Sequence, residues 1–271
     1  MTILVLGNGW IGSILKEYLK ADAFGPKLTD GMNIPESIWN RYDVIINTIA
    51  KTNIDWCEKN KVETANVNIT LAVNLAERCV KTGKKYVFFS SACIFESKNS
   101  RDIKYEDSTP NPACFYAKTK AIAEELVLET NPNTLIIRPR LPLSEVPHPR
   151  NTINKLLSYE KLQNNQESVT VVEDMLPALK SLIEKGESGV INMVNAGTIS
   201  PVQIRRGFDK NFTACSKEEQ DERLAKEGRA RRVTTYVGSK RVPLLPDIRQ
   251  RIKTVIEKYK SYERLNKEVT R

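Results

Sequence analysis

The sequence has no run of about eighteen apolar residues, the minimum length for a membrane-spanning helix, so membrane insertion is not expected. Its five cysteines are odd in number and form no CxxC pair. A disulfide framework and a structural zinc site are therefore disfavoured, no metal is expected, and a reducing compartment, the cytoplasm, is indicated. The opening residues MTILVLGNGW show no basic leader and no small-residue cleavage site, so no targeting peptide is expected.

The 271 residues, 40% of them hydrophobic, are enough for one large domain or for a domain and a half. The net charge of +9 comes from residues 205–271, which hold 19 Lys/Arg against 10 Asp/Glu. Such a basic tail is one mark of nucleic-acid binding, but no recognition-module pattern accompanies it, so nucleic acid is not expected as a partner. A solvated helical face, or a rim that attracts an anionic substrate, explains the charge better.

Short apolar runs alternate with amphipathic stretches through the first half of the chain. This alternation predicts an α/β fold, a doubly wound parallel sheet of the Rossmann type. Strands are expected at 2–7, 43–50, 85–91, 134–139, 169–173 and 189–195, and helices at 11–19, 62–82, 115–129 and 174–185. Beyond residue 196 the chain is polar, basic and expected to be helical. We expect a dinucleotide-binding domain of 1–141 plus 169–195, and a small C-terminal substrate lobe of 142–168 plus 196–271.

A glycine-rich turn, GNGWIG, separates the first predicted strand from the first predicted helix. Gly7 permits the tight turn, Gly9 lets a pyrophosphate approach the backbone, and Gly12 allows the helix to pack closely on the strand. The helix N-terminus then offers N–H groups and a positive dipole end to the phosphates. The strand–turn–helix context favours a dinucleotide site over a purely structural turn. The predicted site comprises Gly7, Asn8, Gly9, Trp10, Ile11 and Gly12.

The choice between the two nicotinamide dinucleotides stays open in the sequence. Asp30 lies near the distance at which an acid binds the ribose of NAD, whereas Lys20 and Lys27 suit the 2′-phosphate of NADP.

Tyr116 and Lys120 form a YxxxK pair within the strongest predicted helix, and the spacing of four places both on one helix face. A neighbouring ammonium stabilises the phenolate and prepares the tyrosine for proton transfer. The chain holds a second pair, Tyr236 and Lys240, so the motif alone is weak. Tyr116 follows a strand that ends in two serines at the ligand-binding edge of such a sheet, which favours the first pair.

Together these features resemble the extended short-chain dehydrogenase/reductase family. The resemblance is closest to the plant- and virus-type bifunctional 3,5-epimerase/4-reductases that make UDP-L-rhamnose, and it runs from about residue 3 to residue 201. The blocks that carry it are NIDWCE (53–58), SACIFE (91–96), FYAKTKA (115–121), RPRLP (138–142), PRNTINK (149–155), TVVEDMLP (170–177) and NMVNAGTIS (192–200).

The resemblance implies a catalytic serine at Ser91, with Tyr116 as the acid and Lys120 as its support. Monofunctional dTDP-4-dehydrorhamnose reductases read Ser-Thr-Asp-Tyr at this strand end, whereas this chain reads Ser-Ser-Ala-Cys. A cysteine at position 93 is similar to the epimerising members, including GDP-fucose synthase. A thiol can take or give a proton beside a ketone, although a small buried hydrophobe is the alternative for Cys93.

Lys155 matches the family's epimerase lysine, with the only histidine, His148, as the alternative partner of the thiol. The resemblance further implies cofactor contacts at Asn47, Ala50, Asn66 and Arg138, although Asn66 equally suits an ordinary polar position of a helix. For the substrate it implies contacts at Ser91, Cys93, Arg140, Arg150 and Asn151.

The implied activity converts UDP-4-keto-6-deoxyglucose to UDP-L-rhamnose with NADPH, or with NADH as the alternative, in a homodimer. Two other interpretations remain at this point. One is a monofunctional reductase of a 4-keto-6-deoxy nucleotide sugar. The other is a non-catalytic, dinucleotide-binding regulatory subunit, against which an intact set of Ser91, Tyr116 and Lys120 argues.

Overall fold

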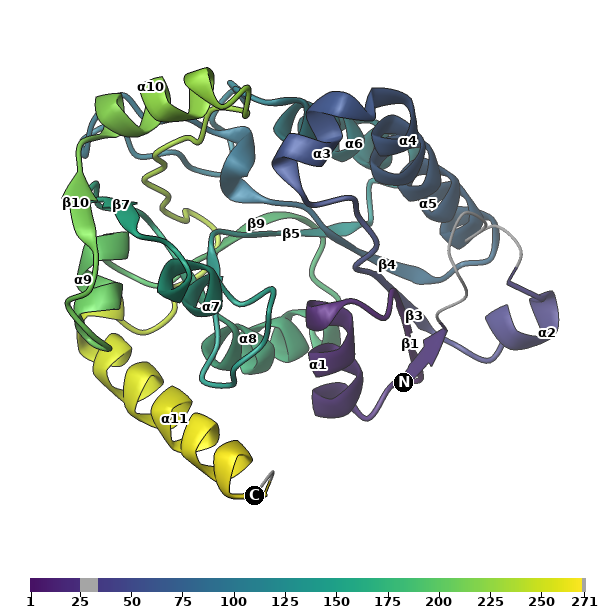
Figure 1. The fold of residues 1–271 in the computed structure, drawn as a ribbon. Helices are drawn as coiled ribbons and strands as arrows, with labels where there is room; N and C mark the ends of the chain where they lie inside the picture. The colour runs from purple at the N-terminus through teal and green to yellow at the C-terminus, as the bar shows by residue number, and fades with distance from the viewer. Residues whose placement is uncertain (25–33, 270–271) are drawn as a thin grey trace. The chain divides into compact units, whose positions relative to one another are not determined.

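The computed structural model describes residues 1–24 and 34–269 (Figure 1). Contacts within the chain divide it into two compact units. Unit 1 consists of the described residues of Met1–Phe95, with Thr109–Arg138 and Ala178–Ile191. Unit 2 consists of Glu96–Ser108, Pro139–Pro177 and the described residues from Asn192 onward.

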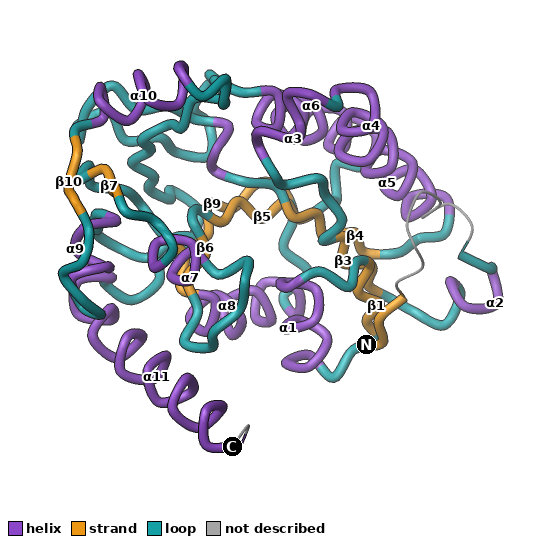
Figure 2. Tube along the Cα trace, viewed as in Figure 1, coloured by secondary structure: helices purple, strands orange, loops and turns teal. Residues whose placement is uncertain are grey.

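A six-stranded sheet, coloured orange in Figure 2, has the order β2-β1-β3-β4-β5-β9. The strands are β1 (Ile3–Leu6), β2 (Asp22–Phe24), β3 (Val44–Asn47), β4 (Lys85–Phe89), β5 (Leu135–Pro139) and β9 (Gly189–Met193). The first five in this order pair in parallel. Their central residues are buried on both faces, as apolar runs of this kind require. The doubly wound parallel sheet predicted from the sequence is thereby confirmed.

Helices of unit 1 cover the sheet and leave its carboxyl edge to the connecting loops. They are α1 (Trp10–Leu19), α2 (Glu36–Trp39), α3 (Ile54–Lys59), α4 (Lys61–Ala65), α5 (Leu71–Lys81) and α6 (Phe115–Thr130), with a 3-10 turn η2 (Ala92–Ile94) after β4. The core packs Leu71 and Leu75 of α5 and Val127 of α6 against Leu4 and Phe88 of the sheet. The apolar spacing that predicted these helices is therefore the spacing that buries them.

The long helix expected at 62–82 is interrupted by a π-helical turn, η1 (Asn66–Thr70), between α4 and α5. A π turn inserts one residue into the helical ladder and is common at functional sites. The apolar pattern did not reveal it, because the residues on either side keep helical spacing. The expected strand at 169–173 was also too long, since β8 (Thr170–Val171) ends where α8 (Val172–Glu184) begins.

Unit 2 has its own apolar core, built around two short parallel sheets. One sheet pairs β6 (Pro142–Leu143) with β8, and the other pairs β7 (Lys161–Gln163) with β10 (Thr213–Cys215). The remaining helices are α7 (Thr152–Leu157), α9 (Pro201–Arg206), α10 (Lys217–Lys226) and α11 (Ile248–Val269). The core includes Leu143, Ile153 and Val171 together with Val202 and Ile204.

The basic C-terminal segment, expected from the sequence to be polar and helical, also contributes apolar side chains to this core. Ile248, Val255 and Tyr259 of α11 are fully buried in the core of unit 2. Arg251 forms ion pairs with Glu145 and with Asp174, and its Nε lies 2.9 Å from Oδ1 of Asp174. Part of the positive charge of the segment is therefore neutralised within unit 2. Among the described helices, none combines the length and the apolar character that a bilayer crossing would need.

We expect truncation of Tyr259 to destabilise the protein and loss of its hydroxyl to do little. The ring is fully buried and lies edge-on to Phe208 at 5.3 Å, while the hydroxyl has no hydrogen-bond partner among the described residues. Tyr259→Ala should cost about 3–5 kcal/mol of unfolding free energy. Tyr259→Phe should leave it unchanged or slightly higher. Urea denaturation of both variants checks this, and an equal loss in the two would contradict the packing argument.

Candidate active site

The glycine turn after β1 is a place where side chains are sterically excluded. Gly7 has a backbone φ of 106°, which residues with a side chain rarely adopt. A Cβ on Gly12 would lie 2.0 Å from the carbonyl oxygen of Gly7 and 2.7 Å from Oγ1 of Thr48. Thr48 is itself fixed, because its hydroxyl donates to the Leu6 carbonyl at 2.9 Å. At this turn β1, α1 and the end of β3 approach so closely that only glycine fits at Gly7 and Gly12.

Helix α1 begins at this turn with an open N-terminus. Gly9 is the N-cap with extended backbone, and within the described chain no side chain caps it and no acidic residue lies in the first turn. Asn8 is exposed, Ile11 is half-buried, and the Trp10 side chain is buried. First-turn N–H groups and the positive end of the helix dipole therefore suit a phosphate. A cradle that excludes Cβ atoms but offers N–H groups fits a dinucleotide pyrophosphate.

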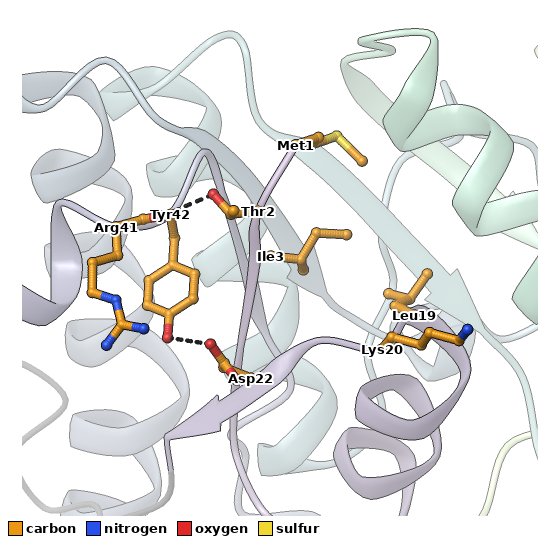
Figure 3. A pocket seen from close by; sticks show the side chains of 8 residues that line it. All are labelled: Met1, Thr2, Ile3, Leu19, Lys20, Asp22, Arg41 and Tyr42. Carbon is orange, nitrogen blue, oxygen red and sulfur yellow. Dashed lines mark hydrogen bonds between the residues drawn. The ribbon is translucent and has the colours of Figure 1, made fainter.

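The residues that were to decide between NAD and NADP do not decide it. Asp30 and Lys27 lie outside the described residues. Lys20 precedes β2 and lines a shallow cavity of about 230 Å³ with Asp22, Tyr42 and the N-terminal Met1 (Figure 3). This cavity is at the amino ends of the strands, whereas Gly7 follows the carboxyl end of β1. The interpretation of Lys20 as a 2′-phosphate ligand was therefore wrong, because a strand of four residues separates the two edges by about 13 Å.

Ser91, Cys93 and Tyr116 lie together at the carboxyl edge of the sheet. Ser91 follows β4 and is the N-cap of η2, so that its hydroxyl accepts a hydrogen bond from the Cys93 N–H at 3.2 Å. Burial raises the pKa of Tyr116 well above its usual range, the nearby Cys93 thiol raises it further, and a hydrogen bond with the Ser91 side chain lowers it. A phenol in this environment is protonated at neutral pH and is an acid. The structure thus brings the predicted serine, thiol and phenol together.

Lys120 lies one helical turn after Tyr116 and is almost completely buried, with 1% of its surface exposed. Its Nζ donates to the Phe89 carbonyl at 2.7 Å and lies 4.1 Å from the centroid of the Phe88 ring. Burial lowers the pKa of this ammonium to about 7, while the negative charge of Glu124 raises it. A lysine that titrates near neutrality in this position is the kind of perturbed group that marks a functional site.

Asn68 is a buried residue of the site that sequence reasoning missed. It lies in the π turn, and its side-chain amide donates to Oγ1 of Thr119 at 3.0 Å and accepts from the Lys51 N–H at 2.8 Å. Because Thr119 precedes Lys120, Asn68 links the loop after β3 to the face of α6 that carries the pair. Asn66, which was expected here instead, is exposed. The π turn was the missing signal, since it decides which asparagine points inward.

The side chains of Asn47 and Arg138 are engaged within unit 1. Asn47 donates to the Tyr86 hydroxyl at 2.8 Å and accepts from the Ile49 N–H at 2.9 Å, which shapes the loop that holds Ala50. Arg138 is ion-paired with Glu124 in the core. Cofactor contacts at Asn47, Ala50, Asn66 and Arg138 stay predictions, and the observed bonds give the first and last of these a structural role.

Two of the predicted substrate residues are similarly engaged in unit 2. Arg140 is buried, pairs with Glu167, and donates to the Val233 carbonyl at 2.7 Å. Asn151 is the buried N-cap of α7, and its amide donates to the carbonyls of Ser144 and Val146 at 2.9 and 3.0 Å. Both side chains hold the loop and the helix that follow β5. Their substrate contacts stay predictions.

His148, Arg150 and Lys155 lie on the same loop and helix of unit 2. His148 is half-buried, and its Nδ1 accepts the Arg150 N–H at 3.0 Å. Burial lowers the pKa of His148, and the charge of Arg150 lowers it further. Lys155 lies in the last turn of α7 with its side chain exposed, as is that of Arg150. An exposed lysine suits a proton-transfer role better than a histidine whose ring already serves the loop.

The second YxxxK pair is not helical. Residues 231–236 have no regular structure, and the Tyr236 carbonyl accepts from the Lys104 N–H at 2.8 Å. Lys240 pairs with Asp107 at 2.8 Å and lies over the Tyr105 ring. The four-residue spacing therefore does not bring this phenol and ammonium onto a common face.

Comparisons with known proteins identify the family of this chain. The family model described as the RmlD substrate binding domain matches residues 1–178. The bifunctional dTDP-4-dehydrorhamnose 3,5-epimerase/dTDP-4-dehydrorhamnose reductase of Arabidopsis thaliana is 31% identical over 235 residues, 78% of this chain and 76% of that protein. A trifunctional Arabidopsis protein, named as UDP-glucose 4,6-dehydratase, epimerase and reductase, is also 31% identical, but the chain spans 33% of its length.

Solved structures extend the likeness to nearly the full chain. The L780 UDP-rhamnose synthase from Acanthamoeba polyphaga mimivirus matches with a TM-score of 0.83 and 25% identity, over 95% of this chain and 99% of that chain. The dTDP-4-dehydrorhamnose reductase of Bacillus anthracis, in complex with NADP, matches with a TM-score of 0.77 over 96% of this chain and 99% of that chain. Its 20% identity makes that second likeness one of fold alone.

We expect Lys120→Met to raise the melting temperature. Burial lowers the pKa of Lys120 from 10.5 to about 7 on folding, so below pH 7 the buried ammonium destabilises the folded state. This penalty fades as the pH rises from 7 toward 10. The variant should therefore melt about 3 °C or more above the wild type at pH 6, and the difference should shrink at pH 9.

Thermal melts of both proteins at the two pH values measure this effect. Lys118→Met, which removes an exposed lysine from the same helix, should leave the melting temperature unchanged. A variant at position 120 that melts below the wild type at pH 6 would show that the ammonium stabilises the fold.

Proposed function

Because this chain belongs to the family of the RmlD substrate-binding domain, we propose that it is an NADPH-dependent oxidoreductase that makes UDP-L-rhamnose from UDP-4-keto-6-deoxyglucose. The resemblance inferred from the sequence is confirmed at the level of the family. The observation that carries the proposal is the grouping of the Ser91 hydroxyl, the Cys93 thiol and the Tyr116 phenol, with Lys120 one turn further along α6. A reductase needs the serine, the phenol and the lysine, and an epimerase needs the thiol in addition.

Reduction of the sugar ketone requires a proton donor at the carbonyl oxygen. Ser91 and Tyr116 hydrogen-bond this oxygen, and the phenol gives up its proton as negative charge develops there. The raised pKa of Tyr116 keeps that proton in place until the ketone is bound. Lys120 stabilises the phenolate that remains and binds the ribose of the cofactor. When bound, NADPH would supply the hydride for carbon 4 of the sugar.

The glycine turn holds the cofactor through its backbone. Gly7 and Gly12 leave no space for a Cβ, and the open N-terminus of α1 at Gly9 would receive the pyrophosphate. The bound NADP of the Bacillus anthracis reductase, which shares this fold, supports the same dinucleotide here. NADH is the alternative.

Inversion at carbons 3 and 5 precedes reduction in this scheme. The ketone at carbon 4 acidifies both C–H bonds, so a base removes one proton and the electron pair moves onto the ketone oxygen. A proton from the opposite face then restores the C–H bond with inverted configuration. We assign the two proton-transfer roles to Cys93 and Lys155. The same hydrogen bonds from Ser91 and Tyr116 stabilise the oxygen in both reactions.

Two further properties are part of the proposal. The five cysteines are all free thiols, which supports a reducing compartment, and we place the enzyme in the cytoplasm. The family resemblance supports a homodimer.

We expect Tyr116→Phe to lower ketone reduction by about 10²–10⁴-fold, the usual contribution of a positioned general acid, while NADPH binding changes little. Stopped-flow oxidation of NADPH by the 4-keto sugar measures the first effect, and cofactor fluorescence measures the second. Tyr236→Phe is the matched control, because that tyrosine belongs to the non-helical pair, and it should behave as the wild type. Equal losses in the two variants would place the acid elsewhere.

We expect Cys93→Ala to stop epimerisation and to spare reduction. In deuterated water the wild type should incorporate deuterium at carbons 3 and 5 of the keto sugar. The variant should lose this exchange at one or both carbons, yet still oxidise NADPH when given a substrate that is already epimerised. Lys155→Ala should share this phenotype and His148→Ala should not. Wild-type exchange in the cysteine variant would leave a monofunctional 4-keto sugar reductase as the better assignment.

A further inference from the structure

The core of unit 1 contains a buried ion pair near Lys120. Glu124 and Arg138 are each 4% exposed, and Nε of the arginine donates to both carboxylate oxygens at 3.0 Å. The guanidinium also lies 5.0 Å from the centroid of the Phe95 ring. Buried ion pairs are weak evidence for stability, since an apolar pair of similar volume often serves as well. Stability alone therefore does not explain why this ion pair is buried here, and its position near Lys120 points to a functional role.

Glu124 is placed where its charge reaches the lysine of the site. It follows Lys120 by four residues, so both side chains lie on the buried face of α6. Arg138, on β5, holds the carboxylate with bidentate geometry, which fixes the position of the carboxylate. The ammonium in turn is held against the Phe89 carbonyl. Lysine, carboxylate and guanidinium thus follow one another along the inner side of the helix.

The other titratable groups around α6 are engaged differently. Tyr116 on the helix and Cys93 on η2 interact with each other. From α3, Glu58 accepts the Phe115 N–H at 2.6 Å, which caps the far end of the helix, and from β4 the Tyr86 hydroxyl bonds to Ala72 and Asn47. From α5, Arg78 lies over the Trp39 ring, and from α4, Glu63 pairs with Lys51. Glu124 is the anion that acts on Lys120 in the described structure.

We propose that Glu124, clamped by Arg138, is a positioning residue whose negative charge holds Lys120 as an ammonium against the Phe89 carbonyl. The inference rests on the proposed reductase function. Without this anion a lysine buried to this degree loses its proton at lower pH, and it can then neither stabilise a phenolate nor donate to a ribose hydroxyl as an ammonium. The ion pair is in this sense part of the site, although neither member touches the substrate.

The test removes both charges together. Glu124→Gln alone would leave Arg138 unpaired in the core, so the informative variants are Glu124→Gln with Arg138→Met, and Glu124→Leu with Arg138→Leu. The control is Glu125→Gln, which removes the exposed carboxylate next to Glu124 on the same helix. Each protein is titrated with NADPH and assayed for reduction of an already epimerised keto sugar between pH 5.5 and 9.5.

In a double variant that keeps the wild-type melting transition, the pH above which reduction declines should fall by about one unit. The pH above which NADPH affinity declines should fall with it, and Glu125→Gln and Glu124→Asp should match the wild type. Wild-type profiles in a folded double variant would overturn the proposal. So would failure of both double variants to fold, because that would assign the pair to the core alone.

The binding measurement separates this inference from the proposed function. A wild-type protein that binds NADPH but reduces no 4-keto sugar would refute the function, while the pH dependence of NADPH binding in the variants would still decide the role of Glu124.

Discussion

The ammonium of Lys120, on the buried face of α6, is almost completely shielded from water. Several groups of unit 1 offset the free-energy cost of burying this charge. A buried ammonium needs an acceptor, a polarisable neighbour or a counter-charge. Here the Phe89 carbonyl, the Phe88 ring and Glu124 supply one of each. The acceptor and the ring belong to β4, so the strand that precedes Ser91 also fixes the lysine. One strand, β4, and one helix, α6, therefore determine the position of the Lys120 side chain and its tendency to keep its proton.

The features that sequence alone predicted are those whose physics is local. The GNGWIG turn was recognisable because only glycine fits at Gly7 and Gly12. The apolar run before the turn and the helical spacing of apolar residues after it also predicted the flanking strand and helix. The Tyr116–Lys120 pair was recognisable because helical spacing alone puts both on one face. The second pair, at Tyr236, shares the spacing but not the helix, and the context of the preceding strand was enough to separate them.

What sequence could not predict depends on partners far along the chain. The π turn leaves no trace in the apolar pattern, so sequence reasoning named Asn66 and did not find the buried Asn68. The ion pairs of Arg138 and Arg140 could not be predicted, because nothing local in the sequence identifies Glu124 and Glu167 as their partners. The last helix was expected to be polar and basic, and the structure adds that its apolar residues Ile248, Val255 and Tyr259 are fully buried. In each case a contact made only after folding decides the role of the residue.

The chain passes from unit 1 to unit 2 between Arg138 and Pro139, and an arginine on either side of that point is ion-paired within its own unit. Breaking a buried pair by removing one partner costs about 3–5 kcal/mol, a large share of a total stability of about 5–15 kcal/mol. Replacing both partners with apolar residues can cost nothing. Single substitutions of Glu167 or Arg140 are therefore costly and paired apolar replacement is tolerated, so these two residues should be inherited or lost as a couple across the family. Glu124 and Arg138 are held more strictly, because losing both would also remove the negative charge beside Lys120.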